Sequence, residues 1–123
     1  MRENILKDKS YNFAIRCVKL YKYLAGEQKE FVLSKQILRS GTSIGANIEE
    51  ANSGQSKKDF IAKLSISLKE ARETHYWLRL LYDCDYLGKN MFDSLVVDCN
   101  EVIALLTKII KTARENEKEE KTK

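Results

Sequence analysis

The chain has 123 residues, of which 43% are hydrophobic and 33% charged, and it contains no proline. This length is typical of one domain with a full hydrophobic core, and the absence of proline favours long helices over turn-rich β-sandwiches and barrels. The 22 basic residues outnumber the 18 acidic ones, and the net charge of +4 permits an anionic partner without requiring one. We therefore expect an all-α, single-domain protein.

No part of the sequence is suited to crossing a membrane or to export. The longest uncharged run covers residues 40–48, far shorter than the roughly 18 apolar residues that a transmembrane helix needs. Charges interrupt the first eight residues, where a secretory signal is apolar. Cys17, Cys84 and Cys99 are odd in number and too far apart for a disulfide framework or a zinc site. We predict a cytoplasmic protein with reduced thiols, no membrane contact and no metal.

The first two helices are predicted from apolar residues at three- and four-residue intervals. The first spans about residues 5–25 and ends near Gly26. The second spans about residues 31–52 and fades where the polar residues 52–54 begin. Its apolar stripe consists of Leu33, Ile37, Ile44, Ile48 and Ala51.

The last two helices are predicted in the same way, with clearer terminal signals. The third spans about residues 57–87, with Ser56 as N-cap and Gly88 as a left-handed stop. The fourth begins near Asn90, and the charged residues 115–123 after it are predicted to form a disordered tail because none is apolar. The loops between helices are about three to six residues long, too short to let the chain cross the bundle before the next helix begins. Residues 1–114 should therefore form an antiparallel, up-down-up-down four-helix bundle.

The sequence shows no catalytic constellation and no cofactor motif. A ferritin-like di-metal site needs carboxylates on all four helices and two Glu-x-x-His pairs. Here the only histidine is His75, and the residue three positions before it is Arg72. No glycine-rich phosphate loop or nucleophile elbow is present either. We predict that the protein is not an enzyme and binds no cofactor.

Two glycines in the middle of the second helix call for an explanation. Gly41 and Gly45 each cost about 1 kcal/mol relative to alanine in a helix. They share one flank of the apolar stripe, whereas Ser43, Asn47 and Glu50 share the other. The alternatives are a ligand or partner contact, and close helix packing with Asn47 and Glu50 in a buried hydrogen-bond network. We favour the packing interpretation.

Basic residues recur along one flank of the first and third helices. Such flanks follow the phosphates of nucleic acids in some proteins, although ordinary solvated helix faces look the same. The candidate cations are Arg16, Lys19, Lys22, Lys58, Lys69, Arg72 and Arg79. Trp77 lies off the central stripe of the third helix, where it is a candidate assembly contact, with packing inside the chain as the alternative.

Three segments resemble a known family. They are residues 43–51 (Ser-Ile-Gly-Ala-Asn-Ile-Glu-Glu-Ala), residues 56–63 (Ser-Lys-Lys-Asp-Phe-Ile-Ala-Lys) and residues 69–74 (Lys-Glu-Ala-Arg-Glu-Thr). The chain is similar here to the 23S rRNA intervening-sequence proteins, which are also called four-helix bundle proteins. Many members have a proline where Gly45 stands and a glycine where Ala51 stands, so this chain resembles a variant branch.

The resemblance implies an antiparallel four-helix bundle that assembles into a ring-like homopentamer. A related branch serves as the accessory protein of diversity-generating retroelements, in which a basic pentamer binds nucleic acid and the reverse transcriptase. Family-characteristic positions are occupied here by Ser43, Asn47, Glu50, Phe60, Glu70 and Glu73. We interpret the polar ones as a structural network, since hydroxyl, amide and carboxylate groups on facing helices can satisfy one another.

Residues and resemblance together predict a non-catalytic, self-associating bundle that presents a basic surface to RNA, DNA or a nucleic-acid-processing protein. The alternative is an oligomeric scaffold whose partners are proteins only. Net charge does not separate the two, because +4 per chain is modest although five copies would carry +20.

Overall fold

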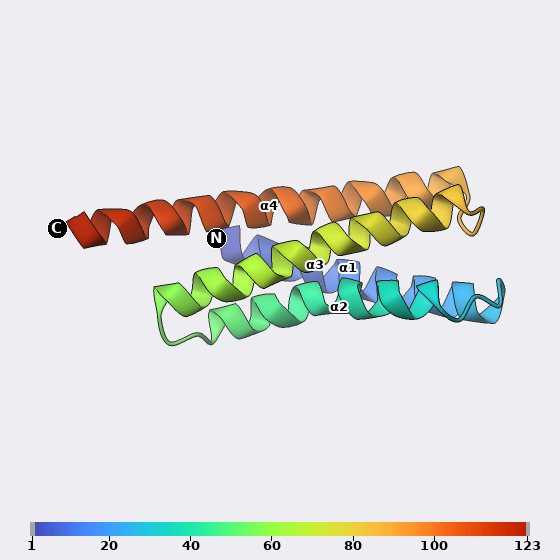
Figure 1. Ribbon diagram of the computed structural model, residues 1–123, viewed down its shortest axis with the longest axis horizontal. Helices are drawn as coiled ribbons and strands as arrows, with labels where there is room; N and C mark the ends of the chain where they lie inside the picture. The colour runs from blue at the N-terminus through green and yellow to red at the C-terminus, as the bar shows by residue number, and fades with distance from the viewer. Residues whose placement is uncertain (1, 123) are drawn as a thin grey trace.

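The computed structural model describes residues 2–122, and the side chains of residues 5–121 within them. Four helices follow one another: α1 (Arg2–Gly26), α2 (Leu33–Asn52), α3 (Lys57–Asp83) and α4 (Lys89–Thr122). Successive helices run in opposite directions and lie side by side along one long axis (Figure 1). The predicted all-α four-helix bundle is thus confirmed. None of the four helices described has the length and apolar content needed to cross a lipid bilayer.

The helices occupy the four corners of the bundle in chain order. α2 packs against α1 and α3, and α4 packs against α3 and, less extensively, against α1. α1 and α3 therefore lie on one diagonal, and α2 and α4 lie on the other. One consequence is that the outward faces of α1 and α3 point away from each other.

A single hydrophobic core runs between the helices. Its largest fully buried side chains include Phe13, Ile44, Leu78 and Leu106, one from each helix. In α3 the most buried line passes through Thr74, and the neighbouring His75 is only half-buried. The stripe predicted for α2 is confirmed, with four of its residues in the core and Leu33 packed against it.

Gly41 and Gly45, the two glycines of α2, differ in what they contact. A Cβ atom at Gly41 would lie 2.9 Å from the Cys17 Cβ atom and closer still to its sulfur, so α1 and α2 approach only because Gly41 has no side chain. A Cβ atom at Gly45 would lie 3.6 Å from the oxygens of Ser10, which is ordinary contact. The packing interpretation is therefore confirmed at Gly41.

The start of α2 is held by a buried carboxylate that the sequence pattern did not reveal. Glu30 accepts hydrogen bonds from the backbone N–H groups of Val32, Leu33 and Ser34 at 3.2, 3.0 and 2.7 Å. Burial acts to raise the pKa of Glu30, but these backbone bonds outweigh it and leave the pKa below the ordinary value of 4.5. The carboxylate thus supplies the helix cap that α2 otherwise lacks.

The turn between α3 and α4 differs from its prediction. α3 ends at Asp83, about one turn earlier than expected, and the left-handed residue is Asp85, with φ of 68°, instead of Gly88. The N–H of Tyr86 bonds to the carbonyl of Leu81 at 2.9 Å and closes the turn. This geometry lets the chain fold back so that Leu87 is buried at the end of the core.

The charged end of the chain also differs from its prediction. The sequence predicts a disordered tail from residue 115, whereas the structure continues α4 as a helix to Thr122, beyond the other helices (Figure 1). Glutamate and lysine are good helix formers, which a pattern based on apolar residues does not register. Lys57 pairs with Glu120, and Lys121 lies 3.8 Å from Glu117 one turn away.

Candidate nucleic-acid interface

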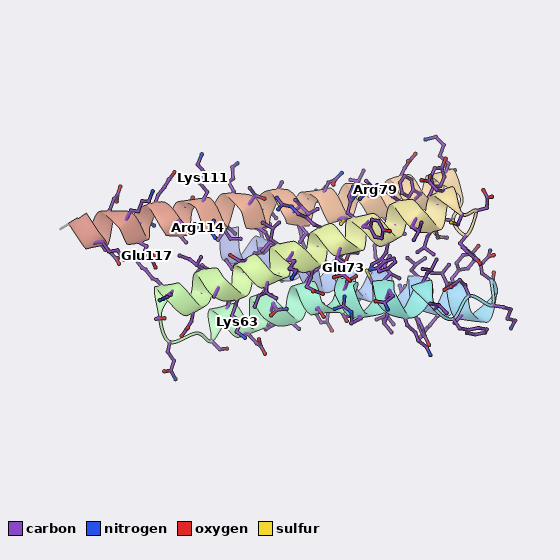
Figure 2. All side chains as sticks on the ribbon, in the orientation of Figure 1. Lys63, Glu73, Arg79, Lys111, Arg114 and Glu117 are labelled. Carbon is purple, nitrogen blue, oxygen red and sulfur yellow. The ribbon has the colours of Figure 1, made fainter. Side chains whose placement is uncertain are left out.

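A groove of about 400 Å³ runs between α3 and α4 on the outside of the bundle. Its base is formed by Leu68 of α3 and by Thr107 and Ile110 of α4. Its rim carries four cations and one carboxylate, namely Arg72, Lys111, Arg114, Lys118 and Glu115. Figure 2 labels Lys111 and Arg114 on α4, with Arg114 on the side of that helix toward α3.

Helical periodicity places these cations together. Residues 107, 111, 114 and 118 follow one another at intervals of three and four and so share one flank of α4. Leu68 and Arg72 are four residues apart and share the facing flank of α3. The core fixes α3 and α4 as far as Ala113, so Arg72 and Lys111 lie on a rigid surface, and Arg114 and Lys118 continue the same flank on the extension of α4.

The groove has an excess of positive charge that the protein itself does not neutralise. Among the residues that the structure describes, Arg72, Lys111 and Lys118 have no ion-pair partner. Arg114 reaches only the hydroxyl of Ser65, at 3.5 Å. Four cations face one carboxylate, so the surface offers binding sites for several anionic groups.

The remaining predicted cations of α3 are spread along the helix. Lys58 and Lys69 are exposed, and Lys69 interacts electrostatically with Glu73. Arg79 is exposed too, but its Nε–H donates to His75 Nδ1 at 3.2 Å and its guanidinium lies 5.7 Å from the centre of the Tyr76 ring. Burial, and then the nearby charge of Arg79, lower the pKa of His75 below its usual 6.5. Only Arg72 of the predicted set lines the groove.

The predicted cations of α1 lie on another face. Arg16 lies 2.7 Å from Asp98 and also donates to the hydroxyl and carbonyl oxygens of Ser94, so α4 neutralises it. Lys19 and Lys22 are exposed, and Lys19 borders a separate pocket of about 240 Å³ between α1 and α4. The structure therefore separates the α1 cations from the groove.

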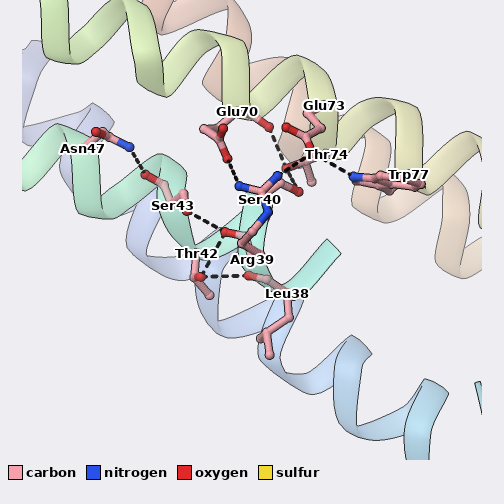
Figure 3. Close-up of polar contacts among 10 residues, drawn as sticks. All are labelled: Leu38, Arg39, Ser40, Thr42, Ser43, Asn47, Glu70, Glu73, Thr74 and Trp77. Carbon is pink, nitrogen blue, oxygen red and sulfur yellow. Dashed lines mark hydrogen bonds and ion pairs between the residues drawn. The ribbon is translucent and has the colours of Figure 1, made fainter. Parts of the chain in front are cut away.

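The polar residues predicted on α2 and α3 are connected mainly through a residue that the sequence pattern missed. Arg39 lies 3.0 Å from Glu70 and also pairs with Glu73 (Figure 3). Ser43 and Asn47 bond only to backbone carbonyls of their own helix, at 2.7 and 2.8 Å. The expected bonds between these two side chains and the carboxylates are therefore not formed. The pattern of residues along α2 does not reveal the role of Arg39, because the carboxylates that it pairs with lie on α3.

Two further contacts complete this α2/α3 seam. Glu50 lies 3.0 Å from Lys63, and the buried hydroxyls of Ser40 and Thr74 bond to each other at 2.8 Å. Trp77 is half-buried beside the seam, where its indole N–H donates to Glu73 at 3.3 Å (Figure 3). These contacts use Trp77 for packing within the chain, although one side of the ring remains accessible.

Little in the described structure is arranged for catalysis. Burial raises the pKa values of Cys17 and Cys99 to about 12, so both remain thiols and are poor nucleophiles. No group of three or more histidine, cysteine, aspartate or glutamate side chains able to hold a metal occurs among the described residues.

Residues 2–122 thus define a class, an antiparallel helical bundle with a charge-saturated seam on one side and a basic groove on another. The family model for the 23S rRNA-intervening sequence protein matches residues 2–108. The chain belongs to this family, as the resemblance predicts. Lys111, Arg114 and Lys118 follow the matched span, so most of the groove's cations lie outside it.

A solved structure of high similarity supports the fold. It is the 1.70 Å crystal structure of a protein with unknown function from the S23 ribosomal protein family of Bacteroides thetaiotaomicron VPI-5482. Its sequence is 58% identical, the match covers 90% of this chain and 99% of that one, and the TM-score is 0.89. No curated protein matches the chain.

Proposed function

We propose that this protein is a non-catalytic, cytoplasmic, self-associating bundle that binds the phosphate backbone of nucleic acid in the groove between α3 and α4. The observation that carries the proposal is the set of cations around that groove, three of which lack an ion-pair partner within the described chain. Elsewhere in the described chain about half of the cations have a carboxylate partner, as Arg16 and Arg39 do, and the unpaired ones do not line a groove with other unpaired cations as these do. Nucleic acids carry a regular array of phosphate charges, which a row of unpaired cations can neutralise.

The groove favours contacts to the backbone over recognition of bases. No aromatic side chain lines it, whereas proteins that bind single strands commonly stack bases on aromatic rings. Only Thr107 offers a neutral hydrogen-bonding side chain there. Binding should therefore depend on charge and shape, with little dependence on sequence.

Salt dependence tests this proposal. In a triple variant, Arg72, Lys111 and Lys118 are each replaced by glutamine, and affinity for mixed-sequence duplex DNA and structured RNA is measured between about 50 and 200 mM salt. Each phosphate contact contributes a log-log slope of about −0.9 on a duplex, so the slope should flatten by about 2 to 3. The matched control changes three exposed lysines, Lys19, Lys29 and Lys35, to glutamine, which removes equal charge away from the groove.

Two outcomes would reject the nucleic-acid proposal. If the wild-type oligomer shows no binding at 50 mM salt, a scaffold with protein partners only is the better account. If the control variant loses as much slope as the groove variant, net charge and not the groove determines binding.

Self-association is tested separately, by light scattering coupled to size exclusion. The family resemblance leads us to propose a homopentamer, with a mass near five times 14.2 kDa. A stable monomer at micromolar concentration would contradict it.

A further inference from the structure

The outward faces of α1 and α3 carry matching seven-residue repeats. On α1, Asp8, Ile15 and Lys22 are spaced seven residues apart, and on α3 Lys69, Tyr76 and Asp83 have the same spacing. All six side chains are exposed. Seven residues are nearly two helical turns, so each triplet forms one straight stripe along its helix. We call these the α1 stripe and the α3 stripe.

Each stripe places large apolar groups in solvent. On α1, Ile15 is 39% exposed and the adjoining Tyr11 is 64% exposed. On α3, Tyr76 is 49% exposed and Ile66 is 45% exposed. The two stripes cannot cover each other within one chain, because α1 and α3 occupy opposite corners of the bundle.

The charged ends of the two stripes are complementary in only one orientation. The α1 stripe reads acid, apolar, base, and the α3 stripe reads base, aromatic, acid. A parallel alignment therefore faces Asp8 with Lys69 and Lys22 with Asp83. An antiparallel alignment would face the two acids with each other and the two lysines with each other, which is repulsive.

These charges have few competing partners in the chain. Asp8, Lys22 and Asp83 form no ion pair with any residue in the described part of the structure. Lys69 interacts with Glu73 one turn away on its own helix. Asp8, Lys22 and Asp83 are therefore available to a second molecule, and the exposed Lys69 can contact one beside Glu73.

The two stripes also lie at similar heights along the bundle. Cys17 and Thr74 both border Gly41 and so mark one level on α1 and α3. Ile15 precedes Cys17 by two residues and Tyr76 follows Thr74 by two, an offset of about 6 Å, or roughly one turn. Because both stripes repeat every seven residues, moving one stripe by about one turn along its neighbour aligns all three pairs of residues at once. Tilting each copy relative to the next produces this shift.

We propose that the α1 stripe of one copy packs in parallel on the α3 stripe of the next copy. This contact rests on the self-association in the proposed function and names the surfaces that form it. It joins two different faces of the molecule, so it repeats from copy to copy and closes into a ring when the rotation allows. The groove's cations on α4, Lys111, Arg114 and Lys118, lie outside the contact and remain open to a polyanion, whereas Arg72 adjoins the α3 stripe.

A charge swap tests the contact between copies. Lys22→Glu and Asp83→Lys should each weaken association by about tenfold, because each places like charges face to face. The double variant restores opposite charges and should recover most of the wild-type affinity, as measured by sedimentation equilibrium. α1 and α3 occupy opposite corners of the bundle and their stripes face away from each other, so recovery reports contact between molecules. The matched control is Lys35→Glu, an exposed lysine of α2 outside both stripes.

Cross-linking provides a second measurement that does not depend on affinity. In a Cys84→Ser background, Lys22→Cys and Asp83→Cys are combined, and mild oxidation should give a reducible ladder of covalent oligomers. Lys35→Cys in place of Lys22→Cys should give no ladder beyond dimers. A wild-type monomer would overturn self-association itself. An assembled wild type with neutral single variants and no ladder would overturn this contact alone.

Discussion

α2 and α4 both pack on α3, but they meet it with different chemistry. Along the α2/α3 seam the charged groups are matched, with Arg39 between Glu70 and Glu73 and Lys63 beside Glu50. Along the α3/α4 groove, four cations face one carboxylate. Both helices contribute side chains to the same core, so the two contacts differ mainly in the charged groups along their edges. A saturated seam contributes to the fold, whereas unpaired cations add nothing to the fold and attract anions.

The largest effect on stability is expected from a substitution at Gly41, where α2 packs closely on α1. Gly41→Leu should destabilise the bundle by about 1 to 3 kcal/mol, the usual cost of overpacking, because its side chain would overlap Cys17. Gly45→Ala has room for its methyl group and should be neutral or stabilising by up to about 1 kcal/mol, through better helix propensity. Urea unfolding of both variants measures the contrast. Equal destabilisation would mean that Gly41 has no special role in packing.

Arginine substitutions on the two sides of α3 compare the seam with the groove directly. Arg39→Met leaves Glu73 and Glu70, which is only 13% exposed, without their partner and should cost about 1 to 2 kcal/mol. Arg72→Met removes an unpaired cation and should change stability by less than about 0.5 kcal/mol. Thermal unfolding of the two variants under identical conditions is the measurement. If Arg72→Met lowered the unfolding free energy more than Arg39→Met, then the groove and not the seam would contribute to stability.

Acid titration sharpens the comparison further. The hydrogen bond from Arg39 holds the pKa of Glu73 below its ordinary 4.5, against the opposing effect of burial. A carboxylate whose folded pKa is lowered stabilises the protein above its unfolded pKa, and this contribution is lost as pH falls through the folded value. Unfolding free energy should therefore decline below about pH 4.5, and less steeply in Glu73→Gln. Identical pH profiles for the two proteins would contradict the structural role of Glu73.

His75, on the flank of α3 that faces α4, gives the smallest expected effect. Burial and the nearby Arg79 lower its pKa below 6.5, so the folded state resists the proton that the unfolded chain accepts. Stability should therefore fall slightly as pH drops below about 6.5, a dependence that His75→Gln removes. Equilibrium unfolding at closely spaced pH values checks this. A rise in stability over the same range would mean that His75 gains a favourable partner when charged.

The sequence predicted what depends on one helix at a time. Apolar periodicity located the four helices and most of the core, and glycine spacing pointed to the close approach at Gly41. The periodicity of one helix does not predict which residues of two different helices contact each other. The neutralisation of Arg16 by Asp98 joins residues 82 positions apart, and the pairs of Arg39 lie on another helix. Apolar periodicity also ends before residue 115, so it does not indicate that Lys118 continues a basic flank of α4.

Binding of nucleic acid in the α3/α4 groove can be tested by chemical footprinting of lysines on the assembled protein, with and without structured RNA. Acetylation read by mass spectrometry reports each lysine separately. RNA should protect Lys111 and Lys118 of the groove, while Lys19 and Lys35 on other faces keep their reactivity. Unchanged reactivity at Lys111 and Lys118, or protection confined to Lys19 and Lys35, would contradict it.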